Sequence, residues 1–307
     1  MTDQARRPHG MLAAVTQARD EESFDRLGVV VVNHAAPTEV LNDAMLRLRA
    51  SAPGARVILV ATGTGTPSPE AGWPEDTEIV RVPNRSYAHA VNAGFAMLDG
   101  VDLLTMMNDD VLVEPRTFAD LVIALRAHPG TGLAGPIPRD ASGRPQDLGV
   151  PYRLAYARAR KSASGAAKVA WLAGCLVVVT REAYVATGGH DQTFRFTNED
   201  IDLSLRAREL GYTSLLVDTD VTHLGGTSTP THPAFHVEGR RGGYLITERH
   251  LPRAAAAAHR AYLVLEGGMG ALLGPTEGSR AAHRTVARMA LTASWHTGPF
   301  GPSLDDR

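Results

Sequence analysis

The chain has 307 residues, of which 44% are hydrophobic and 21% are charged, so it is long and apolar enough to bury a full globular core. Its 31 basic and 33 acidic residues give a net charge of −2, which excludes a global positive field that would recruit nucleic acid or anionic lipid. Nucleic acid is therefore not an expected partner. The single cysteine, Cys175, excludes an internal disulfide and suits a reducing compartment.

Residues 1–26 are expected to form an N-terminal extension. Their apolar run, MLAAV, is too short for the core of a signal peptide. The longest apolar run elsewhere, VAWLAGCLVVV at 169–179, is well short of the roughly 20 residues that span a bilayer. We therefore expect a cytoplasmic protein without a membrane span.

Strand and helix patterns alternate between residues 27 and 136, which predicts a doubly wound α/β sheet with ligands at the carboxyl ends of its strands. Continuous apolar runs are typical of strands buried on both faces, whereas helices show apolar residues at a spacing of three or four. The predicted strands are 27–33, 55–61, 78–83, 101–107 and 131–137. The predicted helices are 37–51, 86–98 and 117–128.

The second half of the chain is less regular. YRLAYARARKSASGAAK (152–168) has no clear period and predicts a mobile loop, whereas two alanine-rich segments near 253–266 and 279–296 predict helices. The expected organisation is one catalytic domain at 27–250 with halves at 27–136 and 137–250. A C-terminal helical extension is expected at 251–307.

Asn108, Asp109 and Asp110 directly follow an apolar strand, and Asn33 ends another. Two carboxylates about 4 Å apart repel by roughly 4 kcal/mol at an effective dielectric near 20, so something must offset the cost of placing them there. One explanation is a turn whose side chains cap the helix that Glu114-Pro115 opens. The other is a divalent cation and the phosphates that it holds.

A second acidic group occurs in TNEDIDLSLRARELG and comprises Glu199, Asp200 and Asp202. Acids favour the first turn of a helix, so helix capping explains most of this pattern. A catalytic base working beside a metal–phosphate clamp also fits it. His223 closes the strand-like VDTDVTH, and taken alone it is either a structural histidine or a metal ligand.

Together and in this order, the motifs resemble those of family 2 inverting glycosyltransferases with the GT-A fold. The most specific are LLTMMNDDVLVEP, WLAGCLVVVTREAYVATGGHDQTF and TNEDIDLSLRARELGYTSLLVDTDVTHLGGTS. The resemblance spans residues 28–250 and is greatest to the rhamnosyltransferase-like subgroup, which includes enzymes that act on polyprenyl-linked sugars in cell-wall and polysaccharide assembly. It implies a mostly parallel central sheet with a C-terminal helical extension.

The resemblance also implies roles for individual residues. Asp110 and His223 match the family's protein ligands for Mn²⁺ or Mg²⁺, and Asp200, with its neighbour Glu199, matches the pair that supplies the catalytic base. Six residues match positions near the donor: Asn33, Asn84, Arg85, Asn92, Asn108 and Asp109. Three match positions near the acceptor: Trp171, Gly174 and Cys175, although packing alone also explains a buried cysteine.

Two motifs depart from the family pattern. The family's second strand usually ends in an Asp that contacts the nucleotide base, whereas this chain has Ala61 and Thr62 there. The usual GG-F-D-E motif is changed to GGHDQ at 188–192, which replaces an aromatic residue and an acid. The first departure leaves the nucleotide unassigned.

We therefore expect a glycosyltransferase of the hexosyltransferase class that uses a UDP-, dTDP- or GDP-sugar. A noncatalytic nucleotide-sugar-binding relative is the alternative that the missing acid favours. A dinucleotide oxidoreductase is disfavoured because VVVVNHAAP replaces a G-x-G-x-x-G motif after the first strand.

An acceptor glycan or lipid-linked sugar is expected. Basic residues that suit a lipid diphosphate or peripheral contact with the inner face of a membrane are Arg153, Arg158, Arg160, Lys161, Arg280, Arg284 and Arg288. A solvated basic surface explains them equally well.

Overall fold

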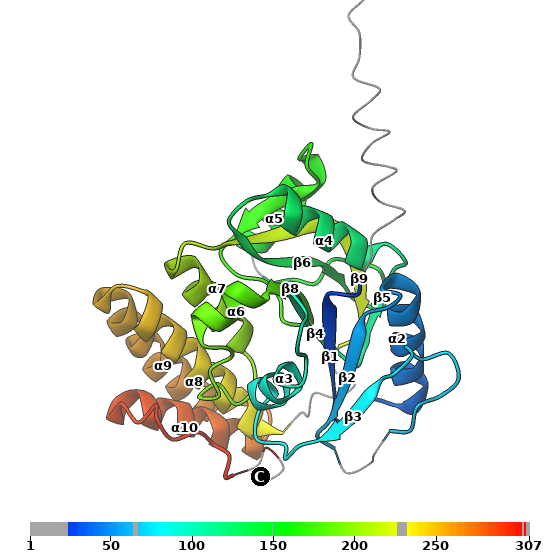
Figure 1. Ribbon diagram of the computed structural model, residues 1–307. Coiled ribbons are helices and arrows are strands. Elements are labelled where there is room, and N and C mark those ends of the chain that lie inside the picture. The colour runs from blue at the N-terminus through cyan, green and yellow to red at the C-terminus, as the bar shows by residue number, and fades with distance from the viewer. Residues whose placement is uncertain (1–23, 64–66, 149, 226–231, 303, 305–307) are drawn as a thin grey trace, which may run out of the picture.

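The computed structural model describes residues 24–63, 67–148, 150–225, 232–302 and 304. All but the last three residues of the expected N-terminal extension lie outside the described part of the chain. The centre of the molecule is one mixed sheet with the strand order β3-β2-β1-β4-β8-β6-β9-β5 (Figure 1). A further strand, β7, lies off this path and pairs with β9.

The first four strands are parallel neighbours: β1 (Leu27–Asn33), β2 (Arg56–Ala61), β3 (Glu78–Arg81) and β4 (Leu103–Asn108). Every residue of β1 is buried, because helices cover both faces of the sheet. The register pairs Asn33 with Ala61 and Val32 with Asn108, so the polar strand ends meet at one edge. These strand predictions are confirmed.

The other strands are β5 (Val111–Val113), β6 (Thr131–Arg139), β7 (Ala166–Val169), β8 (Leu176–Thr180) and β9 (Thr213–His223). β6 and β9 are parallel, whereas β8 runs antiparallel to β4 and β6. β5 is antiparallel to β9 and places Val111 opposite His223. This short pairing brings His223 to the Asn-Asp-Asp turn from more than a hundred residues away.

Successive residues of β1 enter different cores. Val29 and Val31 pack under α2 (Thr38–Ser51) and α4 (Thr117–Ala127). Val30 and Val32 pack on the opposite face, under α3 (Tyr87–Phe95), α6 (Arg181–Thr187) and α7 (Glu199–Glu209). The alternation is the two-residue period of a strand that is buried on both sides.

The expectation of a mobile loop at 152–168 is wrong. This segment forms most of α5 (Val150–Lys161) and of β7, which pairs with β9. Ala155, Tyr156 and Ala159 are buried against the sheet, while Arg158 and Arg160 stay exposed. The buried face of α5 is made mostly of alanine. The difference in hydropathy between its two faces is therefore too small to reveal a helix from the sequence.

Three helices gather beside the sheet at its α7 side: α8 (Pro233–His250), α9 (Arg253–Leu273) and α10 (Glu277–Thr292) (Figure 1). The last two confirm the predicted C-terminal helices. All three share a core with Phe194 and Trp295, so α8 packs with the two helices that follow the expected boundary at 250. Among the described residues, no helix combines the length and hydropathy needed to cross a bilayer.

Candidate active site

A cavity of about 380 Å³ opens at the carboxyl ends of the parallel strands, where the sequence predicted a site. It collects most of the expected site residues from distant parts of the chain. Those that line it are Asn84, Asn108, Asp109, Asp110, Gly174, Cys175, Glu199, Asp200 and His223.

Asp110 and His223, the two predicted metal ligands, lie side by side in the structure. The Nε2 atom of His223 lies 3.4 Å from Oδ1 of Asp110 and 3.4 Å from Nδ2 of Asn108. Oδ2 of Asp110 accepts a hydrogen bond of 3.2 Å from the Gly225 amide. Asp110 is only 4% exposed, so its carboxylate sits largely out of contact with solvent.

Gln146 holds His223 in position and was missed by the sequence analysis, because it lies in an irregular segment without a motif. Its Oε1 lies 3.2 Å from Nδ1 of His223, and its Nε2 donates to the His223 carbonyl at 3.1 Å. With Nδ1 protonated toward Gln146, the lone pair of Nε2 points to Asp110, which is the tautomer that a metal ligand requires.

Gln146→Ala is expected to weaken Mn²⁺ binding by about 10- to 100-fold, because loss of the partner of a ligating histidine frees its ring and tautomer. Calorimetric titration of Mn²⁺ in the presence of nucleotide measures the effect. Gln192→Ala is the control, since Gln192 contacts His89 and does not line the cavity. Equal Mn²⁺ affinity in both variants would contradict the role of Gln146.

Asp109 is placed differently from its neighbour. Its Oδ2 accepts from Nδ2 of Asn33 at 2.8 Å and from the His34 amide at 3.3 Å. Burial and the charge of Asp110 raise the pKa of Asp109 to about 6, while these hydrogen bonds act in the opposite direction. Asn33 lies behind Asp109 rather than among the residues that line the cavity, so the structure gives it a supporting position.

Uncharged polar side chains lie near the end of the second strand, where the family usually has an Asp. The Thr62 hydroxyl donates to the Asn33 carbonyl at 3.2 Å and lies 3.3 Å from Nδ1 of His34. Nδ2 of Asn84 lies 3.5 Å from the same nitrogen, and all three side chains line the cavity. His34 was missed although it follows Asn33 at a strand end, the position type that revealed the other site residues.

Gly174 and Asp200 fit closely together. The Gly174 amide donates to Oδ2 of Asp200 at 2.7 Å, and Oδ1 accepts from the Ile201 amide at 2.8 Å. A Cβ on residue 174 would lie 3.0 Å from the Asp200 Cβ, which explains the glycine. Burial raises the pKa of Asp200, but both amides stabilise its ionised form.

The surroundings of Glu199 disfavour the ionised form of its carboxyl. It is buried, its Oε2 atom has no hydrogen-bond partner, and burial together with the charge of Asp200 raises the pKa of its carboxyl. The Gly174 and Ile201 amides therefore favour the ionised form of Asp200, whereas Oε2 of Glu199 has no such partner. This arrangement supports Asp200, rather than Glu199, as a proton acceptor.

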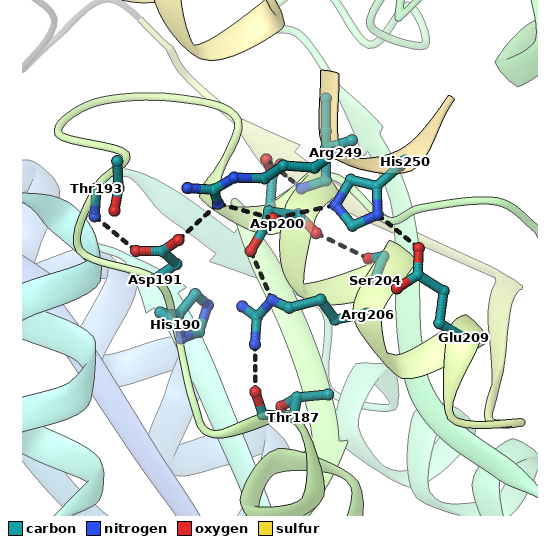
Figure 2. A network of polar contacts seen from close by, with 12 residues as sticks. Thr187, His190, Asp191, Thr193, Asp200, Ser204, Arg206, Glu209, Arg249 and His250 are labelled. Atoms are coloured by element: carbon teal, nitrogen blue, oxygen red, sulfur yellow. Dashed lines mark hydrogen bonds and ion pairs between the residues drawn. The ribbon is translucent and has the colours of Figure 1, made fainter. Parts of the chain in front are cut away.

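A buried polar network fixes α7, which carries both acids. Arg206, Arg249 and His250, which Figure 2 labels, each contact the fully buried Asp202, at 2.7 Å, 3.5 Å and 3.1 Å respectively. The Ser204 hydroxyl also donates to the Asp200 carbonyl at 2.8 Å. Asp202, the third acid of the motif, is thus a structural residue that anchors α7 to α8.

Besides Asn33, three of the expected residues do not line the cavity. Arg85 is exposed, and its carbonyl accepts a hydrogen bond from Arg195. Trp171 packs against the core below α3. Asn92 is fully engaged elsewhere: its amide donates to the His190 carbonyl at 2.9 Å and accepts from the His190 amide and the Tyr184 hydroxyl. We therefore expect Asn92 to support this loop, and its predicted contact with the donor remains a prediction.

The altered GGHDQ motif is anchored by the same contacts. His190 is buried with its ring 5.6 Å from Tyr184 and 6.5 Å from Phe95, measured between centroids. Burial and the charge of Arg206 lower its pKa to about 3, so the ring is neutral and packs as an aromatic side chain would. The histidine thus occupies the place of the missing phenylalanine.

Asn92→Ala is expected to lower the free energy of unfolding by about 1–3 kcal/mol, because it leaves buried partners of the α6–α7 loop unpaired. Nucleotide affinity should stay within about twofold, since Asn92 does not line the cavity. Chemical denaturation and nucleotide titration provide the two readouts. A large loss of affinity in a variant of normal stability would restore Asn92 to the donor site.

Other residues of the cavity wall carried no sequence signal. Phe196 and Phe235 line it edge to face with centroids 4.7 Å apart, and Leu304 reaches it from the end of the chain. Tyr87 lines it as well, and burial followed by the charge of Glu199 raises its pKa well above 10, so it remains a hydroxyl donor.

Residues 25–237 match the family described as "Glycosyltransferase like family 2". The chain belongs to this family. It is 27% identical over 231 residues to the N-acetylglucosaminyl-diphospho-decaprenol L-rhamnosyltransferase of Mycobacterium tuberculosis, a match that covers 63% of this chain and 75% of that one. This glycosyltransferase therefore has a family assignment that agrees with the resemblance of its motifs.

Two solved structures share the fold. The mannosyltransferase PcManGT from Pyrobaculum calidifontis, in complex with GDP-Man and Mn²⁺, gives a TM-score of 0.52 at 16% identity, covering 93% of this chain and 92% of that chain. GalNAc-T7 with UDP, GalNAc and Mn²⁺ gives a TM-score of 0.55 at 14% identity, covering 95% of this chain and 65% of that chain. The predicted GT-A fold and glycosyltransferase class are confirmed.

Proposed function

We propose that this glycosyltransferase moves a sugar from a nucleotide-diphosphate donor to an acceptor hydroxyl with inversion, using a divalent cation. The observation that carries the proposal is the meeting of Asp110, His223 and Asp200 around one cavity. Each comes from a different element, and neither capping nor packing requires them to share a wall.

The oxygen-rich turn and one imidazole fit Mn²⁺ or Mg²⁺. Asp110 and Nε2 of His223 would hold the ion, with Asn108 beside them. When bound, such an ion supplies positive charge to the departing diphosphate. Both relatives of known structure were solved with Mn²⁺, which supports this assignment.

Asp200 would accept the proton of the acceptor hydroxyl as that oxygen attacks the anomeric carbon. The new bond forms on the side opposite the diphosphate, so the bond to the leaving oxygen breaks with inversion. Gly174 and Ile201 hold the carboxylate still through their amides. The adjoining Glu199 shares the buried position, and we assign it a supporting role.

Thr62, His34 and Asn84 would contact the nucleoside of the donor. His34 follows β1, Thr62 follows β2, and Asn84 contacts His34. All three line the same cavity as the proposed metal ligands. A hydroxyl, an imidazole and an amide offer both donors and acceptors without a negative charge. Nucleotide-binding measurements, rather than this geometry, will identify the donor as a UDP-, dTDP- or GDP-sugar.

A lipid-linked sugar is our proposed acceptor, supported by the decaprenol-linked substrate named for the mycobacterial relative. Helix α9 exposes large apolar side chains that suit peripheral membrane contact: Tyr262, Leu265, Met269, Leu272 and Leu273. The predicted basic residues suit it less, because Arg280 and Arg284 pair with Glu277, and Arg153 pairs with Asp147.

The test is a transfer assay with purified protein, Mn²⁺, each of the three nucleotide-sugar classes and a short polyprenyl diphospho-sugar. Release of one nucleotide, with an anomeric configuration in the product opposite to that of the donor by NMR, would support the proposal. A product that retains the donor configuration would overturn inversion. Binding of nucleotide without release from any donor would instead favour the noncatalytic alternative.

A further inference from the structure

A second cluster of ligand-type side chains lies away from the candidate active site, where the three C-terminal helices meet. It consists of His236 on α8, Glu266 on α9 and His283 on α10, here called the helix-junction triad. One potential ligand atom from each residue lies within 4.8 Å of the other two. None of the three lines the active-site cavity.

The polar atoms of the triad are buried without partners. Nε2 of His236, Oε2 of Glu266 and Nδ1 of His283 each expose less than 1 Å² and accept or donate no hydrogen bond. Nδ1 of His283 lies 3.8 Å from Oε1 of Glu266, which is too long for a hydrogen bond. Native proteins rarely leave one buried polar atom unpaired, and three in one place point to an additional group between them.

Helix α9 is shaped to admit one of these rings. A Cβ on Gly270 would lie 2.3 Å from Cγ and Nδ1 of His283, so any side chain there would displace the imidazole. A Cβ on Gly267 would lie 2.8 Å from the Ala287 amide, which shows how closely α9 and α10 approach. The two glycines thus bring His283 up to Glu266, and the His236 ring lies with its centroid 4.5 Å from that of His283.

Arg240 balances the negative charge of Glu266 in the triad. Nη2 of Arg240 donates to Oε1 of Glu266 at 2.9 Å, which orients the carboxylate and leaves Oε2 free. Outer partners of this kind are typical of carboxylates that ligate metals.

We propose that the helix-junction triad binds a zinc ion that clamps α8, α9 and α10 together. Two imidazoles and one carboxylate are a zinc-type donor set, with a water molecule as the fourth ligand. The active-site pair beside its Asn-Asp-Asp turn is richer in oxygen and suits Mn²⁺ or Mg²⁺ instead. The proposal does not depend on sugar transfer, since the triad lies outside the catalytic cavity.

The experiment measures zinc in chelator-treated full-length protein after incubation with Zn²⁺ and removal of the unbound ion. It uses the Asp110→Ala variant as the parent, so that active-site zinc does not contribute. We expect the parent to retain about one zinc ion per chain, and the added changes His283→Ala or Glu266→Gln to weaken zinc binding by at least about tenfold. His296→Ala, which changes an exposed histidine after α10, is the matched control and should change nothing.

Two further readouts keep the test decisive. Gly270→Ala removes no ligand but should displace the His283 ring and lower zinc affinity as well. In the parent, Co²⁺ should give the intense visible absorption of a four-coordinate site, and Zn²⁺ should raise the melting temperature. Zinc content equal in the parent and in a folded Glu266→Gln variant, or no zinc in the parent, would overturn the proposal.

Discussion

Asp200→Asn is expected to lower sugar transfer by about 10²- to 10⁴-fold, the usual contribution of a general base. The substitution keeps the shape of the side chain and an oxygen that can accept from the Gly174 amide, so the fold should persist. Nucleotide affinity in the presence of Mn²⁺ should remain close to that of the parent. Initial rates at saturating donor, together with nucleotide titration, separate the two effects.

Two controls define this result. Asp99→Asn changes an exposed aspartate and should leave the rate unchanged. Glu199→Gln should cost less than Asp200→Asn, because burial and the neighbouring charge keep the Glu199 carboxyl protonated more readily. Transfer at the parent rate by Asp200→Asn, or a greater loss in Glu199→Gln, would contradict the assignment of the base.

Asp110→Ala is expected to remove the gain in nucleotide affinity that Mn²⁺ provides. Loss of an outer partner alone costs a metal site about 10- to 100-fold, so loss of the ligand itself should cost about 100-fold or more. Removing Asp110 also relieves Asp109, whose pKa of about 6 is raised partly by the charge of its neighbour. The folded structure should therefore tolerate the change.

The readout for Asp110→Ala is a calorimetric comparison of nucleotide binding with and without Mn²⁺. His223→Ala should produce a similar loss, because both residues contribute to the same contact of 3.4 Å. Asp99→Ala is the control, because it also removes one negative charge but lies outside the cavity. A Mn²⁺ effect that survived in both site variants would place the ion elsewhere in the molecule.

The first half of the fold could be predicted because its strands are long, apolar and buried on both faces. β1, β2 and β4 therefore stand out in the sequence. α5 could not be predicted, because alanines form most of its buried face and give little contrast in hydropathy. β7 depends on pairing with β9, a tertiary contact that has no local signal.

The candidate site was predictable to a similar degree. Asp110, Asp200 and His223 are polar residues at the ends of regular elements, a position that the pattern reveals. Gln146 was not, because its role lies in holding His223 through an irregular segment. Asn92 shows the opposite difficulty: the sequence does not reveal that its side-chain amide is hydrogen-bonded to the backbone of His190.

The measurement that tests the central claim most directly is calorimetric titration of the purified protein with UDP, dTDP and GDP, each with and without Mn²⁺. The account predicts that one nucleotide binds tightly only when Mn²⁺ is present, and that Asp110→Ala abolishes this dependence. Equal binding with and without Mn²⁺ would contradict the metal clamp at Asp110 and His223. Failure of all three nucleotides to bind would contradict the donor site itself.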